Sequence, residues 1–114
     1  MQGCVFCRIV EHKVPAQIVH ADDLTVAFQD LRPQAPLHVL VIPKKHISTL
    51  NDLAVDDNPL VGHMFQVAKT VAQQFNVHEK GYRTVFNVNA GAGQSVYHIH
   101  LHVLGGRMFS WPPG

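Results

Sequence analysis

The sequence predicts an α+β fold, a largely antiparallel sheet with helices on one side. Three observations favour this class. Short apolar segments alternate with Gly, Pro and Asp turns, which is typical of strands joined by tight connections. One longer segment keeps helical spacing over several turns. The 114 residues, 46% of them hydrophobic, suffice for one compact core and are too few for two ordinary domains.

The N-terminal part of the chain contributes a short helix and the first two strands. We expect the helix over Cys4–His12, which has an apolar side, and Pro15 ends it. Gln17–His20 and Thr25–Gln29 have the character of strands, and Ala21-Asp22-Asp23 between them suits a hairpin turn.

A loop, a buried strand and a long helix follow. Leu31–Pro36 contains two prolines and is a loop, whereas the β-branched segment His38–Ile42 indicates a buried strand that Pro43 stops. Asn58 as N-cap and Pro59 as first helical residue indicate a helix start. The residues after them form one broad apolar face at helical spacing, made of Leu60, Val61, Met64, Phe65, Ala68, Val71, Ala72 and Phe75.

Two further strands are expected near the C-terminus. Tyr82–Val88 follows the breaker Gly81, and Val96–Leu104 ends at Gly105-Gly106. The loop between them, Asn89–Gln94, and the adjoining Ser95 carry small side chains, so that backbone N–H groups there can approach an anion closely.

The charge pattern argues against two classes of partner. The net charge is +1, and no basic run is longer than Lys44-Lys45, so neither a nucleic-acid backbone nor an acidic membrane surface is expected as a ligand. No segment has the roughly 20 apolar residues that cross a bilayer. Met1–Cys4 has no signal-peptide character, and we therefore expect a cytoplasmic protein.

Three of the nine histidines alternate with aliphatic residues. On a strand, His98, His100 and His102 share one face, whereas a helix would split them. The alternative is a half-exposed strand whose polar face carries histidine by chance. One zinc ion bound by all three is disfavoured, because the outer pair is about 13 Å apart on a strand and zinc takes nitrogen at about 2.0–2.1 Å.

A row of imidazoles beside a small glycine-bearing loop favours chemistry on a phosphate. Neutral imidazole is a nucleophile near neutral pH, because its ordinary pKa is about 6.5 and the ring keeps an available lone pair. His100 is central and is flanked by the other two, which can orient it or hydrogen-bond phosphate oxygens. The sequence thus predicts a nucleophilic histidine at position 100.

The segment Gln94–Arg107 resembles the signature of the histidine-triad (HIT) nucleotide-binding proteins, His-φ-His-φ-His-φ-φ with φ apolar, in their HINT branch. Phe28–Lys45, Gly81-Tyr82-Arg83 and Trp111–Gly114 are also similar to that branch, so the resemblance covers nearly the whole chain. It implies a single HIT domain over residues 1–114, a five-stranded antiparallel sheet with one long and one short helix, and a homodimer whose sheets join into ten strands.

The resemblance also implies an activity, the hydrolysis of purine nucleoside 5′-phosphoramidates through a covalent nucleotidyl-histidine, with no cofactor required for catalysis. By position, His100 matches the nucleophile, His98 and His102 its triad partners, His38 a fourth histidine and Asp30 the acid that holds the ribose. The positions matched to the purine pocket are Val5, Phe6, Ile9 and Leu31. Those beside the phosphate are Asn87, Gly93, Gln94 and Ser95, of which Ser95 donates toward the leaving nitrogen. Trp111 matches a residue that reaches the partner's site.

Cys4 and Cys7 have the two-residue gap of a zinc knuckle or a redox pair. Zinc needs two more ligands, for which His46 and His98 are the candidates, and superfamily members that carry this cysteine pair resemble such a Cys₂His₂ arrangement. Two free thiols that pack the first helix, and a thioredoxin-like pair, stay as alternatives. If His98 binds zinc, it supports His100 from behind.

Some positions depart from the HINT pattern. Gln29 stands where relatives often carry histidine, and Asn89 and Ala92 replace frequent glycines, which affects substrate preference more than chemistry. Two other functions stay open: a nucleotide-binding regulatory or scaffold protein, and a dinucleoside polyphosphate hydrolase or nucleotidyl transferase of the same superfamily. An intact triad with Ser95 argues against the first, and Ser95 with the Trp-Pro-Pro-Gly tail argues against the second.

Overall fold

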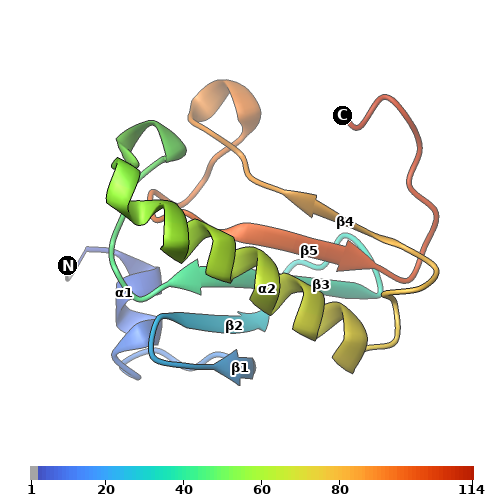
Figure 1. Cartoon of the computed structure of the whole chain (residues 1–114), viewed down its shortest axis with the longest axis horizontal. Coiled ribbons are helices and arrows are strands. Elements are labelled where there is room, and N and C mark those ends of the chain that lie inside the picture. The colour runs from blue at the N-terminus through green and yellow to red at the C-terminus, as the bar shows by residue number, and fades with distance from the viewer. Residues whose placement is uncertain (1–2) are drawn as a thin grey trace.

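The computed structural model describes residues 3–114, so that Met1 and Gln2 of the N-terminal segment considered above lie outside it. Figure 1 follows the chain through its elements. The helices and strands are α1 (Val5–Val10), β1 (Ile18–Ala21), β2 (Thr25–Gln29), β3 (Leu37–Pro43), α2 (Asn58–Gln74), β4 (Tyr82–Val85) and β5 (Leu101–Gly105).

The strands form one five-stranded sheet in the order β1-β2-β3-β5-β4, and every neighbouring pair is antiparallel. The α+β class and the antiparallel sheet are therefore confirmed. The central strand β3 is buried along its whole length, which explains its nearly continuous apolar sequence. β1 and β4 are the edges, and each is only partly buried.

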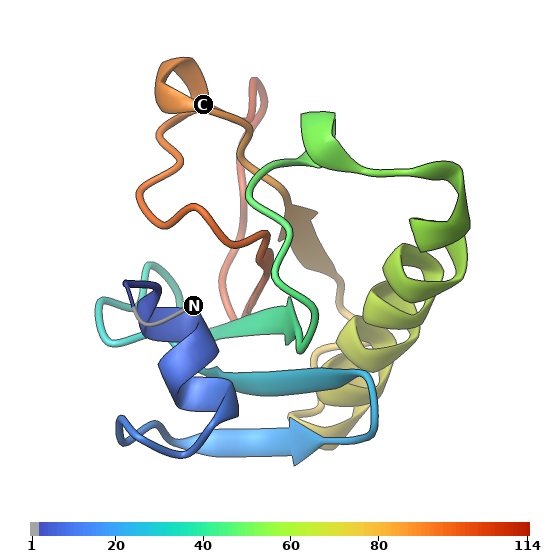
Figure 2. The ribbon, with the colours of Figure 1, turned by 90° about the vertical axis from the view of Figure 1, so that its left-hand side faces the viewer.

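The two helices lie on opposite faces of the sheet, so the expectation that both lie on one side is wrong (Figure 2). α2 packs on the face formed by Val39 and Val41 of β3 and by Val103 of β5. α1 packs on the other face, against Phe28 and Leu40. The reason is visible in the sequence. Consecutive residues of β2 and β3 are apolar and point to opposite faces of the sheet, so both faces are apolar and each needs a helix to cover it.

The histidine-rich strand is shorter than predicted. β5 contains His102, whereas His98 and His100 precede it in irregular backbone. β5 pairs with β3 from Gly105 back to Leu101, opposite Val41. Two residues farther along β3 the register reaches Pro43, which has no N–H to continue the ladder. The prediction of a strand from Val96 is therefore wrong, although the side chains still alternate: Ile99, Leu101 and Val103 join the α2-side core.

Smaller corrections concern element ends. α2 begins at Asn58, so Asn58 is not the N-cap. The preceding Asp57 ends a 3-10 turn, and its carboxylate accepts hydrogen bonds from the Ala54 N–H at 2.9 Å and from Lys45 Nζ at 2.6 Å. β4 stops at Val85 rather than Val88. On α2, Phe65 is 45% exposed and packs edge-on against Phe86. Between residues 3 and 114 no helix is long and apolar enough to span a bilayer.

Candidate functional site

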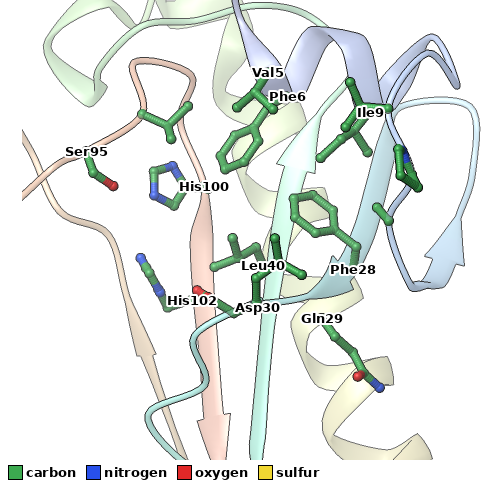
Figure 3. A pocket seen from close by; sticks show the side chains of 15 residues that line it. Val5, Phe6, Ile9, Phe28, Gln29, Asp30, Leu40, Ser95, His100 and His102 are labelled. Atoms are coloured by element: carbon green, nitrogen blue, oxygen red, sulfur yellow. The ribbon is translucent and has the colours of Figure 1, made fainter.

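A cavity of about 270 Å³ opens between α1 and the sheet. Figure 3 shows side chains from α1, β2, β3 and the segment before β5 around it. Of the sequence-predicted residues, the cavity wall contains Val5, Phe6, Ile9, Asp30, Leu31, Ser95, His100 and His102. Residues far apart in the chain are thus brought together on the α1 face. Ser95, His100, His102 and Asp30 lie at one end of the cavity, and the apolar side chains lie at the other, with Gln29 beside Phe28.

Phe6 of α1 forms the wall between the apolar end of the cavity and the histidines. Its ring meets Phe28 at 5.4 Å and His100 at 5.1 Å between centroids, both edge-on. Phe28 and Leu40 also line the cavity and were not predicted as site residues. Phe28 and Leu40 are apolar residues of two predicted strands. These strands pair so that Phe28 lies opposite Leu40, and both side chains face α1.

His100 is held in one tautomer. Its Nδ1–H donates to the backbone carbonyl of His98 at 2.8 Å, which leaves the lone pair on Nε2. Burial lowers the pKa of His100, so the ring is neutral at neutral pH. His100 is 7% exposed and lines the cavity beside Ser95. A neutral imidazole with a fixed, accessible lone pair can act as a nucleophile.

His102 and His38 form a second group with Asp30 at the polar end of the cavity. His38 Nε2 lies 2.9 Å from His102 Nδ1 and 3.4 Å from an Asp30 carboxylate oxygen. Burial lowers the pKa of His38, and it lowers the pKa of His102 to about 4, so both rings are neutral. Within residues 3–114, His102 Nε2 is the one buried side-chain nitrogen or oxygen without a hydrogen-bond partner.

The hydrogen bonds fix where the protons of this second group lie. The backbone N–H of Gln34 donates to His38 Nδ1 at 3.0 Å, so that nitrogen carries the lone pair and the proton sits on Nε2. His38 Nε2–H then donates to His102 Nδ1. A metal ion on His38 Nε2 would leave that ring without a proton on either nitrogen. The Asp30–His38–His102 group is close enough for a metal, but its proton pattern does not fit one.

Cys4, Cys7, His46 and His98 form a different cluster, whose ligand atoms all lie within 4.8 Å of one another. The Nδ1 atoms of His46 and His98 are 3.2 Å apart. Cys7 Sγ lies 3.2 Å from the first and 3.5 Å from the second, and Cys4 Sγ lies 3.4 Å from His98 Nδ1. Tetrahedral zinc bonds would give nitrogen–nitrogen and sulfur–nitrogen separations of about 3.3–3.6 Å, so this donor set fits zinc.

The surroundings of the cluster also suit a metal. His98 Nε2–H donates to the Pro43 carbonyl at 2.7 Å, which keeps Nδ1 free to bind. Burial lowers the pKa of His98 to about 4, and burial raises the pKa of the Cys7 thiol, so a thiolate there needs a positive charge close by. The Cys7 N–H donates to Cys4 Sγ at 3.4 Å. His98 is fully buried and is not part of the cavity wall; it contacts His100 through its carbonyl.

Of the predicted catalytic and nucleotide-binding residues, six lie outside the cavity wall: His38 and His98, whose contacts are given above, and Asn87, Gly93, Gln94 and Trp111. Gln94 is buried, and its amide is fully used in the loop: its oxygen accepts the Asn89 N–H at 2.8 Å, and its nitrogen donates to the carbonyls of Ser48 and Val96. Trp111 is 81% exposed.

An antiparallel five-stranded sheet with two neutral histidines, His100 and His102, in the wall of a partly apolar cavity and a third, His98, buried beside it is the arrangement expected of a histidine-triad protein. The comparisons agree. A family model described as scavenger mRNA decapping enzyme C-term binding matches residues 3–110. The purine nucleoside phosphoramidase of Escherichia coli K12 is 46% identical over 103 residues, 90% of this chain and 87% of that protein.

Solved structures agree as well. A HIT family hydrolase from Legionella pneumophila is 55% identical with a TM-score of 0.96, over 97% of this chain and 99% of that one. A zinc-bound histidine triad family protein from Mycobacterium smegmatis is 33% identical with a TM-score of 0.81, over 93% and 76%. The chain belongs to the HIT superfamily, and it is a hydrolase of that superfamily.

Proposed function

We propose that this protein, folded as one HIT domain, hydrolyses purine nucleoside 5′-phosphoramidates to an amine and the nucleoside monophosphate. The observation that carries the proposal is the His100 ring, neutral and with its Nε2 lone pair available, in the wall of a cavity with one apolar and one polar end. The E. coli relative named for this activity supports it.

The cavity wall suggests how a nucleotide binds. The purine packs among Val5, Phe6 and Ile9, with Leu31, which is 96% exposed, at the mouth. Asp30 accepts the two ribose hydroxyls; its Oδ1 is held by the Arg32 N–H at 2.8 Å, which orients the carboxylate. The phosphate then lies between His100, His102 and Ser95. For Asn87, Gly93 and Gln94 we propose support of the phosphate loop rather than side-chain contact.

The reaction proceeds in two displacements at phosphorus. His100 Nε2 attacks, a bond from Nε2 to phosphorus forms, and the phosphorus–nitrogen bond to the amine breaks. The departing amine takes a proton from the Ser95 hydroxyl, which regains one from water. A water molecule then attacks phosphorus, the bond to Nε2 breaks, and His100 recovers its lone pair. His102 Nε2–H stabilises the non-bridging oxygens in both displacements.

We further propose a structural zinc ion at Cys4, Cys7, His46 and His98. Support comes from the donor distances and from the zinc-bound relative. Bound there, zinc ties α1 to the segments after β3 and before β5, which fixes the His98 carbonyl that orients His100. No step of the reaction uses the metal.

A homodimer completes the proposal. β4 is an edge strand with all four residues half-buried, and the neighbouring Phe65 is exposed, which suits pairing with a second copy. Trp111 is exposed and does not line the cavity of its own chain, as expected of a residue that serves the partner's site.

The test compares substrates and one variant. Wild-type protein is mixed with an adenosine 5′-phosphoramidate of a fluorescent amine and, separately, with diadenosine tetraphosphate. We expect amine release, at least about 1,000-fold slower in His100→Ala, while the variant still binds AMP. Comparable turnover by the variant would refute the nucleophile. Cleavage of the tetraphosphate alone would favour the polyphosphate hydrolase, and AMP binding without any turnover would favour a nucleotide-binding scaffold.

A further inference from the structure

The loop between β2 and β3 is anchored at Gln34 from two directions. The Gln34 N–H donates to His38 Nδ1 at 3.0 Å, and the Gln34 carbonyl accepts the Arg107 Nε–H at 2.9 Å. Arg107 lies two residues after the end of β5, so it connects the C-terminal segment through Gln34 to His38, the residue beside Asp30 and His102. Neither Gln34 nor Arg107 lines the cavity.

Arg107 is itself held in place. Its guanidinium donates to the Met108 carbonyl at 3.1 Å and lies 4.3 Å from the Phe109 ring centroid, a cation–π contact. Arg83 of β4 also lies over Phe109, at 5.1 Å, and donates to the Ser110 carbonyl. The contacts of Arg83 go to the C-terminal segment, whereas Arg107 reaches the loop as well. The two arginines therefore form a matched pair in which one touches Gln34.

The contact at Gln34 decides the direction of a chain of hydrogen bonds. A backbone N–H can only donate, so His38 Nδ1 must accept and His38 Nε2 carries the proton. That proton points to His102 Nδ1 at 2.9 Å, with the Asp30 carboxylate at 3.4 Å on the same side. His102 is then protonated on Nε2, the buried nitrogen that has no partner within the described residues.

The opposite arrangement would remove a donor from the site. If His38 carried its proton on Nδ1, its Nε2 lone pair would require a proton on His102 Nδ1. His102 Nε2 would then present a lone pair, which repels the oxygens of a phosphate instead of stabilising them. Two groups favour the first arrangement: the Asp30 carboxylate, which can only accept and lies 3.4 Å from His38 Nε2, and the Gln34 N–H outside the cavity, which makes the shorter contact, 3.0 Å to His38 Nδ1.

We propose that the Gln34 backbone N–H and the Arg107 guanidinium are positioning groups, which lock His38 and His102 in their Nε2–H tautomers and so keep on His102 Nε2 a proton that a substrate phosphate can accept. The catalytic consequence rests on the proposed phosphoramidate hydrolysis. The tautomer lock does not, since it exists in the protein without substrate.

The tautomers can be read by long-range proton–nitrogen NMR on the full-length, uniformly nitrogen-labelled protein at neutral pH. Wild-type protein should show a pyrrole-like Nε2 and a pyridine-like Nδ1 for both His38 and His102. Gln34→Pro removes the N–H and should shift His38 toward the Nδ1–H form, whereas Gln34→Ala keeps the N–H and the wild-type tautomers. A backbone amide spectrum verifies that each variant is folded.

Arg107→Met and Arg83→Met provide a second pair that keeps the Gln34 backbone intact. Arg107→Met should give mixed tautomers at His38 and lower kcat for the phosphoramidate about 3- to 10-fold with little change in KM, and Arg107→Lys should recover part of the loss. Arg83→Met should leave both tautomers, and kcat within about twofold, as in wild type.

Three results would overturn the proposal: a wild-type His38 protonated on Nδ1, unchanged tautomers in both folded Gln34→Pro and Arg107→Met, or changed tautomers with an unchanged kcat. A wild-type protein with the expected tautomers but no hydrolysis of any phosphoramidate would instead refute the proposed function and, with it, the catalytic part of the proposal.

Discussion

The α1 face of the sheet carries two clusters that each contain a pair of neighbouring histidines, one pair with two cysteines and the other with an aspartate, and the clusters differ in how their protons are arranged. In the Cys4–Cys7–His46–His98 cluster, the Nε2–H of His98 points away from the cluster (the outer nitrogen) and donates to the Pro43 carbonyl. Its Nδ1 (the inner nitrogen) directs a lone pair toward the other three side chains. In the Asp30–His38–His102 cluster, the outer nitrogen of His38 is an acceptor and the inner one is the donor. The backbone group that meets the outer nitrogen is a C=O in one cluster and an N–H in the other.

That difference is what we propose separates the zinc site from the proton-ordered site of the reaction. A carbonyl partner leaves the inner lone pair for a cation, whereas an N–H partner commits the inner nitrogen to a proton. Proximity alone does not distinguish the two clusters, because within each cluster the possible ligand atoms lie within 4.8 Å of one another. His100 lies between them and takes its orientation from the first through the His98 carbonyl.

The largest effect is expected from Cys7→Ser, which removes a thiolate from the proposed zinc site. Zinc content, measured by atomic emission, should fall from one per chain to none, and the free energy of unfolding should fall by at least about 3 kcal/mol, because metal binding contributes to folding. His102→Asn serves as the control at the other cluster and should keep its zinc. Full zinc content in Cys7→Ser would contradict the division between the clusters.

Next in size is the loss of the donor at His102. Asn at this position can still accept from His38 but lacks an N–H at the place of Nε2, so kcat/KM for the phosphoramidate should fall about 100-fold. His102→Gln restores an amide donor near that place and should lose only about 10-fold. Equal losses in the two variants would contradict a donor role.

A smaller effect, on the free energy of unfolding, is expected where the β2–β3 loop packs against the residue after β5. Gly106 has φ of +90°, and a Cβ there would lie 2.8 Å from the Pro36 Cβ, whereas Gly81, with φ of +114°, has open space. Gly81→Ala should cost about 1 kcal/mol of unfolding free energy from backbone strain alone, and Gly106→Ala about 2–3 kcal/mol. Urea denaturation compares them, and equal costs would contradict a close contact between Gly106 and Pro36.

The smallest effect concerns acid. Burial lowers the pKa of His102 to about 4, so as the pH falls from 6.5 toward 4 the unfolded chain takes up a proton that the folded protein refuses. The contribution of His102 to the free energy of unfolding is therefore constant above its unfolded pKa of about 6.5 and decreases below it, by about 1–2 kcal/mol. His102→Asn should reduce the loss between pH 7 and pH 4.5 in chemical denaturation. An identical pH dependence in the variant would contradict a buried neutral imidazole.

Much of the fold could be read from the sequence, because alternation and helical spacing are local signals. The side of the sheet that α1 covers was missed, although its signal is in the sequence: both faces of β2 and β3 are apolar, so each face needs a helix to cover it. The early end of the ladder before Leu101 depends on the register with β3, which brings Pro43 opposite Ile99, 56 residues farther along the chain.

The candidate site follows the same division. The cluster of His100 with Phe6 and Asp30 was predictable from motif and resemblance. For His98 the sequence left two roles open, a zinc ligand that supports His100 or a direct triad partner, and for His38 it gave only a place in the site. The choice of role depends on which backbone group meets the ring nitrogen that points away from the cluster, the Pro43 carbonyl for His98 or the Gln34 N–H for His38. A sequence pattern specifies the imidazole but not the position of its proton.

The central claim, that His100 attacks phosphorus and water follows in a second displacement, is tested most directly by the stereochemistry at phosphorus. An adenosine 5′-phosphorothioamidate of one configuration is hydrolysed in isotopically labelled water, and the configuration of the product thiophosphate is determined. Two in-line displacements predict net retention. Net inversion would mean that water attacks the substrate directly and would contradict a covalent intermediate on His100.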